Sequence, residues 1–408
     1  MTENPGRAIP VRPRGDDDEQ VELRRELHRY PDLSNQEGAT AARLRGYLER
    51  HQPDRIVTGV GGSGLLAVFR GESPGPRIAF RAELDALPIE ESLDLEYGST
   101  VPGVSHKCGH DGHMAIVAGL APLLARRRPL RGEVLLLFQP AEETGEGAAR
   151  VVQAPAFTEL APDRIYALHN LPGFSLGTVV VRRDVFASGS IGLDIRLYGV
   201  TSHAAEPERG VSPARAVAKL IETISTIGPP ESAPLEDPPG MSTPKSSVPG
   251  TLATVIHARV GDPAFGVTPG YGEVLATLRS PDSGELARLT DRIETLARNV
   301  AAERGLRVEL ERTEEFHATT NDPECAEVVR RAAQSLGSEV NVPEQPFRWS
   351  EDFGRFTEVG AGVLFGLGSG TDQPALHRPE YDFPDELLAL GTSLFLEIVS
   401  IELGLPLA

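Results

Sequence analysis

The sequence predicts an α/β fold, with a mostly parallel sheet flanked by helices and a smaller α+β domain inserted into it. Short apolar runs alternate with helical patterns towards both ends of the chain, which is typical of parallel sheets. Between residues 188 and 313 the order becomes β-α-β-β-α-β, which indicates a ferredoxin-like unit. A chain of 408 residues is also too long for one ordinary core, so we expect two domains.

The larger domain is expected to occupy residues 21–187 and 314–408, on either side of the insertion. Residues 1–20 are rich in Pro, Gly and charged side chains, so we expect them to form a disordered lead. This lead contains no apolar stretch of the kind that a secretion signal requires.

Helices and buried strands are expected to alternate along the larger domain. One helix is expected from Val21 to near Pro31 and a second over Glu37–Arg50, because apolar residues recur there with helical spacing. Asp111 is expected to cap the helix that follows it. Five short apolar runs have the composition of strands buried on both faces: Leu65–Phe69, Ile78–Phe80, Val134–Phe138, Ile165–Leu168 and Val363–Leu367.

The inserted domain, residues 188–313, is expected to contain four strands and two helices. The connection Gly228–Gly250 is rich in Pro and Ser, which predicts a surface loop. The expected elements in chain order are the strand Ile191–Gly199, the helix Pro213–Ile227, the strands Leu252–Val260 and Gly272–Leu278, the helix Gly284–Glu303 and the strand Arg307–Glu311.

Composition excludes several classes of partner. The formal net charge of −19 would repel nucleic acids and anionic membranes. No run of ~18 apolar residues exists that would form a membrane span. Cys108 and Cys325 are the only cysteines, so there is no disulfide framework, and we expect a cytoplasmic protein.

The segment Ser105–His113 concentrates metal-binding side chains. It holds three of the ten histidines, one cysteine and one aspartate within nine residues. Thiolate, imidazole and carboxylate groups bind borderline-soft divalent metals such as zinc, and the two glycines allow the backbone to bend so that side chains converge. Taken alone, the segment is also compatible with a reactive thiol or with a polar helix start.

Polar residues follow the predicted strands repeatedly. In open α/β sheets, ligands bind outside the carboxyl ends of the strands, so we expect these residues and the Cys108 segment to converge on one metal site. The residues concerned are Arg81–Asp85, Gln139–Glu143, His169 and His377.

The pair Glu142 and Glu143 predicts hydrolytic chemistry. Two adjacent glutamates are usually an exposed surface pair, but these follow directly after a buried strand and Gln-Pro. In extended backbone, neighbouring side chains point to different sides, so one carboxylate can bind metal while the other faces metal-bound water. That second carboxylate can take a proton from the water and later deliver it to a leaving group.

Five segments resemble those of the metal-dependent amidohydrolases related to aminoacylase and carboxypeptidase G, and most closely the branch of hippurate hydrolase and indole-acetyl-amino-acid hydrolase. The resemblance covers nearly all of the chain from Val21 onward, with the segments in the same order. It implies a zinc-peptidase-like catalytic domain and an inserted lid domain that forms a homodimer. The segments are His28–Glu37, Arg81–Ile89, Cys108–His113, Gln139–Glu143 and Leu376–Pro384.

The resemblance also implies a role for each site residue. Two divalent ions per subunit, zinc or manganese with cobalt or nickel as alternatives, would be held by Cys108, His110, Glu143, His169 and His377, with Cys108 bridging. Glu142 would be the general base and acid, and Asp85 a carboxylate that orients a ligand histidine. His106 and His113 are expected to support the ligands without binding metal.

Two residues of the inserted domain keep alternative interpretations. His203 would stabilise the oxyanion in the partner subunit's active site, or it is an ordinary surface histidine. Arg279 would bind a substrate carboxylate as a bidentate fork, or it forms a surface salt bridge. The sequence departs from the family pattern at Glu83, where aspartate is usual, at Lys107, where a small residue is common, and at Gly266, where a lid asparagine is usual.

The expected function is hydrolysis of the amide bond of N-acyl amino acids or similar small conjugates, an activity of the EC 3.5.1 type. The expected partners are therefore a small-molecule conjugate and a second copy of the chain. A dipeptidase or aminopeptidase with the same metal centre is the alternative within the enzymes. A ligand-binding homologue without activity is the alternative outside them, although such a protein has no use for a base such as Glu142.

Overall fold

The computed structural model describes residues 14–228 and 248–406, which divide into two compact units. The large unit comprises residues 14–186, 319–345 and 352–406. The insert unit comprises the described residues of Ala187–Ala318 and the short segment Pro346–Glu351. Within the described residues, no helix is long and apolar enough to cross a membrane.

The large unit is built on a mixed, mostly parallel sheet of eight strands in the order β1-β2-β4-β3-β5-β14-β6-β13, as far as the residues are described. Parallel pairing joins β4 to β3, β3 to β5, β5 to β14 and β6 to β13. The predicted mostly parallel sheet is therefore confirmed. Its strands are β1 (Arg55–Val60), β2 (Gly64–Arg70), β3 (Arg77–Glu83), β4 (Glu133–Gln139), β5 (Arg164–Pro172), β6 (Val179–Val180), β13 (Val340–Asn341) and β14 (Ala361–Gly370).

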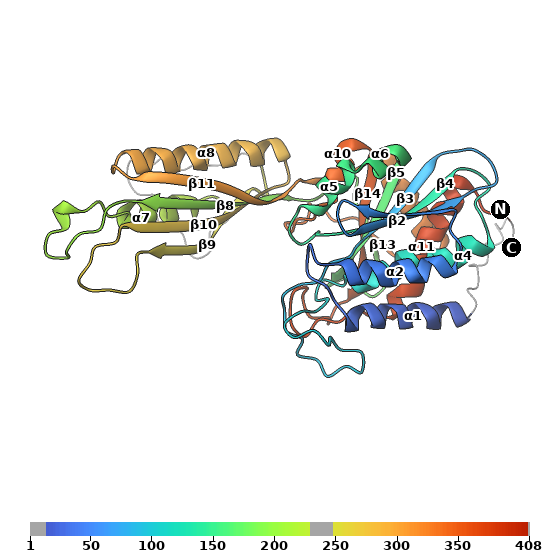
Figure 1. Ribbon diagram of the computed structural model, residues 1–408. Helices are drawn as coiled ribbons and strands as arrows, with labels where there is room; N and C mark the ends of the chain where they lie inside the picture. Colours follow the sequence, from blue (N-terminus) through green and yellow to red (C-terminus); the bar gives the residue numbers. More distant parts are fainter. Residues whose placement is uncertain (1–13, 229–247, 407–408) are drawn as a thin grey trace. The chain divides into compact units, whose positions relative to one another are not determined.

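Helices cover both faces of this sheet (Figure 1). The core between sheet and helices is continuous and includes contacts between aromatic rings, such as Phe80 against Phe395 with ring centroids 4.7 Å apart. A short two-stranded sheet of β7 (Asp184–Ala187) and β12 (Thr319–Asn321) completes the unit. The helices are α1 (Arg14–Arg29), α2 (Gly38–Arg50), α3 (His110–Ala118), α4 (Leu120–Arg126), α5 (Gly147–Gln153), α6 (Pro155–Leu160), α9 (Pro323–Ser335), α10 (Gly354–Val359) and α11 (Glu386–Leu403).

The disordered lead predicted for residues 1–20 is wrong for residues 14–20, which form the start of α1. Gln20 is buried, and its side-chain amide donates to the carbonyl oxygen of Ala115 at 2.9 Å and to the hydroxyl of Thr392 at 2.8 Å. These contacts join α1 to α3 and α11. Asp17 and Asp18, two of the charged residues of this segment, lie near the N-terminus of the helix, where negative charge is favourable. Residues 1–13 lie outside the described residues.

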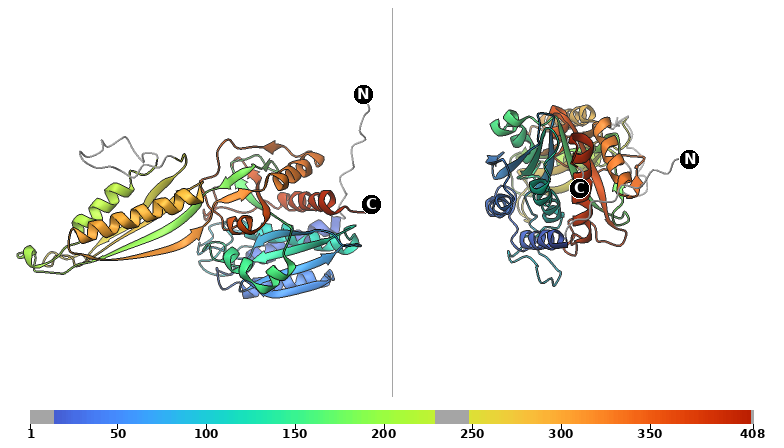
Figure 2. Two further views of the ribbon diagram at one scale, coloured as in Figure 1. Left: turned by 90° about the horizontal axis from the view of Figure 1, so that it is seen from above. Right: turned by 90° about the vertical axis from the view of Figure 1, so that its right-hand side faces the viewer.

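The insert unit has the predicted ferredoxin-like arrangement, which is confirmed. Its sheet has the order β11-β8-β10-β9 with all neighbours antiparallel, and α7 and α8 pack on one face of it (Figure 2). The expected loop Gly228–Gly250 falls largely outside the described residues. The elements are β8 (Gly189–Tyr198), η1 (Pro207–Arg209), α7 (Ala214–Ile224), β9 (Leu252–Val260), β10 (Tyr271–Ser280), α8 (Ser283–Ala302) and β11 (Arg307–Phe316).

Candidate metal centre and active site

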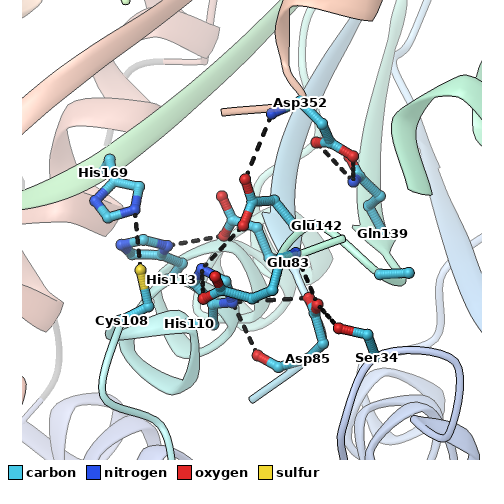
Figure 3. A network of polar contacts seen from close by, with 12 residues as sticks. Ser34, Glu83, Asp85, Cys108, His110, His113, Gln139, Glu142, His169 and Asp352 are labelled. Atoms are coloured by element: carbon cyan, nitrogen blue, oxygen red, sulfur yellow. Dashed lines mark hydrogen bonds and ion pairs between the residues drawn. The ribbon is translucent and has the colours of Figure 1, made fainter. Parts of the chain in front are cut away.

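Side chains from five segments of the large unit gather beyond the carboxyl ends of its central strands (Figure 3). Asp85 follows β3, the pair Glu142 and Glu143 follows β4, and His169 lies near the end of β5. Cys108 and His110 stand at the start of α3, and His377 lies in the loop between β14 and α11. Because parallel strands end at the same edge of the sheet, residues far apart in sequence meet here.

All five predicted ligands belong to overlapping groups that have the spacing of a metal site. Ligand atoms lie within 4.8 Å of one another in each of these groups: Cys108, His110 and His169; Cys108, Glu143 and His377; His110, Glu142 and Glu143. The sulfur of Cys108 is common to the first two groups, as a ligand shared by two ions must be. The sulfur lies 3.6 Å from His169 Nε2, and His377 Nε2 lies 3.9 Å from Glu143 Oε2.

The histidines of this cluster are oriented for metal binding by their other ring nitrogen. His110 Nδ1 lies 2.8 Å from the carbonyl oxygen of Asp85, and His169 Nδ1 lies 3.0 Å from that of Asn170. A carbonyl only accepts, so each Nδ1 carries the proton and the lone pair of each histidine is on Nε2. His110 Nε2 and Glu143 Oε1 are buried without a hydrogen-bond partner. Thiol, imidazole and carboxylate donors with such orphaned atoms fit a divalent metal.

The electrostatics of the cluster also favour a cation. Burial raises the pKa of Glu143 to about 7 and raises the pKa of the Cys108 thiol well above its usual value. Burial also lowers the pKa of His169 to about 3, so this imidazole is neutral and ready to bind metal. Because ligand carboxylates and thiols must be deprotonated, metal binding at this site is coupled to proton release.

The loop after β4 is held so that its two carboxylates have different surroundings. Ala141 adopts a left-handed φ of 49°, and its N–H donates to Glu37 Oε1 at 2.9 Å. The N–H of Glu143 donates to Asp85 Oδ2 at 3.0 Å. Glu142 is buried, and its Oε2 lies 3.8 Å from His110 Nε2. Glu142 and Glu143 therefore both lie near His110, and of the two only Glu143 also groups with Cys108 and His377.

Asp352 is a buried residue at the site that the sequence did not single out. Its N–H donates to Glu142 Oε1 at 3.4 Å. Its carboxylate accepts from Arg81, from Gln139 Nε2 and from the N–H of Ala148, at 2.7, 2.7 and 2.8 Å. Asp352 thus bonds to residues on both sides of the loop after β4, Gln139 before it and Ala148 after it. Figure 3 shows its contacts with Gln139 and Glu142. No local pattern marks this aspartate, because its partners lie 200 or more residues away.

Asp85 contacts the ligand histidine differently from the expectation. Its main-chain carbonyl, and not its carboxylate, accepts from His110 Nδ1. Its carboxylate instead accepts from Ser34 Oγ at 2.7 Å and from the N–H of Glu143 at 3.0 Å, while Oδ1 lies 3.8 Å from His110 Nδ1. Asp85 therefore contacts two predicted ligands, His110 through its main chain and Glu143 through its carboxylate.

The prediction that Asp111 caps α3 is wrong. The residue that precedes the helix is Gly109, and no side chain caps it. Asp111 lies inside the first turn, where it pairs with Arg24 Nε at 2.8 Å and with His28 Nδ1 at 2.8 Å. The buried charge of Arg24 offers this carboxylate a stronger partner than main-chain N–H groups do.

Both glycines of the Cys108–His113 segment are sterically required. Gly109 has a φ of +90°, and a Cβ there would lie 2.5 Å from the side-chain oxygen of Asn170. A Cβ on Gly112 would lie 2.5 Å from the ring of Phe383. Gly109 therefore provides the expected backbone bend, and both glycines also allow close packing.

His113 and His106 are fully buried beside the ligands. His113 Nδ1 lies 2.8 Å from Glu83 Oε2, and its Nε2 contacts Asn170. Glu83 also pairs with Arg81. Burial lowers the pKa of His106 to about 3, so this ring is neutral. His113 also belongs to a candidate metal group with Glu83 and His110, so the supporting roles of both histidines stay predictions.

His203 and Arg279 belong to the insert unit, and their proposed roles stay predictions. His203 is exposed, and its Nδ1 accepts from the N–H of Ala205 at 3.0 Å. Arg279 donates to Ser350 Oγ at 2.8 Å and to the carbonyl oxygen of Arg348 at 3.2 Å. Gly266 has open space around it, and Phe265 before it is fully exposed.

Replacing Asp352 by alanine is predicted to lower the free energy of unfolding by about 3 kcal/mol, because Arg81 loses a buried charged partner. Equilibrium unfolding in urea measures this change. Glu49→Ala, which removes an exposed i,i+4 pair with Arg45, is the control and is expected to cost about 0.5 kcal/mol or less. Equal effects of the two substitutions would contradict the anchoring role of Asp352.

Comparison with known proteins agrees with this geometry. The chain is 31% identical over 383 residues to an N-acetyl-L-cysteine deacetylase of Bacillus subtilis, covering 92% of this chain and 86% of that protein. It is 30% identical over 388 residues to the IAA-amino acid hydrolase ILR1-like 4 of Arabidopsis thaliana, covering 92% and 83%.

A solved structure shares the fold. It is a Bacillus subtilis protein described as a dinuclear metal-binding peptidase from the M20 family, with a TM-score of 0.78, 26% identity and coverage of 96% of this chain and 99% of that one. Residues 79–400 also match the model of Peptidase family M20/M25/M40. The chain therefore belongs to this family, which confirms the resemblance seen in the sequence.

Proposed function

We propose that the protein is a metal-dependent amidohydrolase that cleaves N-acyl amino acids or similar small conjugates into a carboxylate and a free amine. The observation that carries this proposal is the buried Glu142 beside two ligand groups that share Cys108. The names of the relatives support the substrate class, because one is a deacetylase of N-acetyl-L-cysteine and another hydrolyses conjugates of an amino acid.

Two divalent metals are proposed for the site, and Cys108, which belongs to two candidate groups, would be a ligand in both. His110, His169, Glu143 and His377 supply the remaining protein ligands. The solved relative is described as dinuclear, which supports this number of ions. Zinc or manganese suits the mixture of donors best, and cobalt or nickel also fits. When bound, such metals lower the pKa of water and polarise the substrate carbonyl.

Glu142 is proposed to move the proton. Its carboxylate takes a proton from the attacking water as the C–O bond forms, and passes it to the leaving nitrogen as the C–N bond breaks. The N–H of Asp352 holds one oxygen of this carboxylate, which leaves the other, Oε2, facing the ligand groups. His203 of the partner subunit is proposed to stabilise the oxyanion, and Arg279 to bind a substrate carboxylate.

The insert unit is proposed to form a homodimer through one edge of its sheet, and the two edges differ in the side chains that they expose. At the β9 edge, residues 256–260 are exposed, and Ile256 and Val260 have exposed fractions of 62% and 39%. The β11 edge instead carries charged side chains such as Glu309, Glu311 and Arg312. An exposed apolar edge pairs readily with another strand, whereas charges discourage such pairing. The β9 edge is therefore the proposed interface.

Glu142→Gln is predicted to reduce turnover by at least about 10²-fold while metal content stays near that of the wild type, because the amide cannot accept the proton. Hydrolysis of an N-acyl amino acid and elemental analysis measure the two quantities. Glu146→Gln, an exposed glutamate of the same loop, is the control and should retain full activity. Wild-type turnover in Glu142→Gln would refute the mechanism.

A substrate panel is predicted to favour acyl amino acids over peptides. The peptidase name of the solved relative makes a dipeptidase the second candidate function. We expect kcat/KM for N-acetyl or N-benzoyl amino acids to exceed that for dipeptides of the same residues by at least about tenfold, a difference of 1.4 kcal/mol. The reverse preference would establish the second candidate.

Ile256→Lys is predicted to convert the dimer to a monomer, because it places a charge on the proposed interface strand. Light scattering coupled to size-exclusion chromatography measures the mass. Val342→Lys replaces a valine of the large unit with a similar exposed fraction of 63% and should leave the dimer intact. A monomeric wild type, or a dimeric Ile256→Lys variant, would exclude this interface.

A further inference from the structure

We propose that Lys107 is a positioning residue that fixes the metal ligand His377 relative to the metal ligand Cys108. This inference deepens the proposed function and rests on its assignment of the two ligands. The inference concerns metal affinity. This quantity is measured without substrate and does not depend on the proton transfer proposed for Glu142.

Lys107 holds both ends of the short segment 377–381. Its carbonyl oxygen accepts from the N–H of His377 at 2.9 Å, and its Nζ donates to the carbonyl oxygen of Tyr381 at 2.8 Å. Cys108 is the next residue along the chain. Lys107 therefore bonds to the main chain at both ends of the segment that carries the proposed ligand His377. Its neighbour Cys108 is another proposed ligand.

His377 depends on such anchoring because its own contacts are few. Its side chain is 53% exposed, and its backbone has a φ of +64°, a conformation that costs free energy in a residue with a Cβ. The other proposed ligands lie on or beside buried strands and the start of α3. A ligand in an exposed loop keeps its position only where neighbouring main-chain bonds hold the loop.

The ammonium group of Lys107 is fully buried and tied on its other side to Glu91. The Glu91 carboxylate also accepts from the N–H of Ser99 at 2.9 Å and lies 3.0 Å from His28 Nε2. A lysine is buried only when it is paired. The pair with Glu91 fixes the ammonium group in the place from which it reaches the carbonyl of Tyr381.

Tyr381 extends the same connection to a third ligand segment. Its hydroxyl accepts from Asn170 Nδ2 at 2.6 Å, and Asn170 follows the proposed ligand His169 directly. The ring of Tyr381 is fully buried. Lys107 and Tyr381 together join the segments of Cys108, His377 and His169.

The test is metal affinity in Lys107→Met, which keeps the main-chain bond to His377 and removes the contacts of Nζ with Tyr381 and with Glu91. Apo protein is titrated with Zn²⁺ and with Co²⁺ in competition with a chelator. We expect the weaker-bound ion to lose about 10- to 100-fold in affinity, the effect typical of residues that orient ligands. The thiolate-to-cobalt absorption should persist because Cys108 remains. Wild-type affinity in Lys107→Met would overturn the inference.

A double-mutant cycle shows whether Lys107 acts through His377. His377→Ala weakens binding by itself, and adding Lys107→Met to it should cause little further loss, because the residue being positioned is already absent. Additive losses in the double variant would show that Lys107 acts elsewhere and would overturn the inference.

The variant Glu91→Gln/Lys107→Met separates positioning from the cost of an unpaired buried charge, because it removes both charges of the pair. We expect its thermal stability to approach the wild type while its metal affinity stays low. Full recovery of affinity would mean that Lys107 serves only the ion pair. A wild-type protein that binds neither ion would overturn the metal centre itself, an outcome distinct from failure of the Lys107 variants alone.

Discussion

Burial of acidic and thiol ligands at one edge of the sheet is the constraint on which the rest of the structure depends. Glu142 and Cys108 are buried there, and the low polarity around Cys108 and Glu143 raises the pKa of both groups. Transfer of such groups from water costs several kcal/mol unless opposite charge or hydrogen bonds offset it. A divalent cation between these groups offsets that cost, and the surrounding protein must hold them in place until one binds.

Buried cationic side chains near the proposed ligands hold these groups in place. Arg81 pairs with Asp352 behind the loop that carries Glu142, and Arg24 pairs with Asp111 one residue after His110. Lys107 pairs with Glu91 directly before Cys108. In each case the cation pairs with a carboxylate that is not itself a proposed metal ligand. The positive charges therefore fix the geometry without competing for the metal-binding atoms.

The sequence predicts that the proposed ligands lie close together, which the structure confirms, but it does not predict the contacts that support them. His169 and Glu143 follow apolar runs, and the rule that parallel strands end at one edge is enough to bring them together. Asp352 lies 210 residues from Glu142 and stands in no periodic pattern, so its contact depends on where the chain re-enters the large unit. Gln20 was assigned to a disordered lead for a similar reason, since its partners in α3 and α11 are remote. Local composition reports local preference, whereas both of these side chains are placed by tertiary contacts.

The dispersal of the ligands makes the metal centre a consequence of the tertiary fold. Cys108, Glu143 and His377 share one candidate ligand group although the whole insert unit lies between Glu143 and His377 in the sequence. No isolated segment can assemble this group, in contrast to a zinc site whose ligands lie in one short motif. Metal binding then favours the folded state alone, and the free energy of binding adds to the stability of the whole unit. For this reason a residue such as Lys107, which joins two ligand segments, affects metal affinity even though it touches no metal.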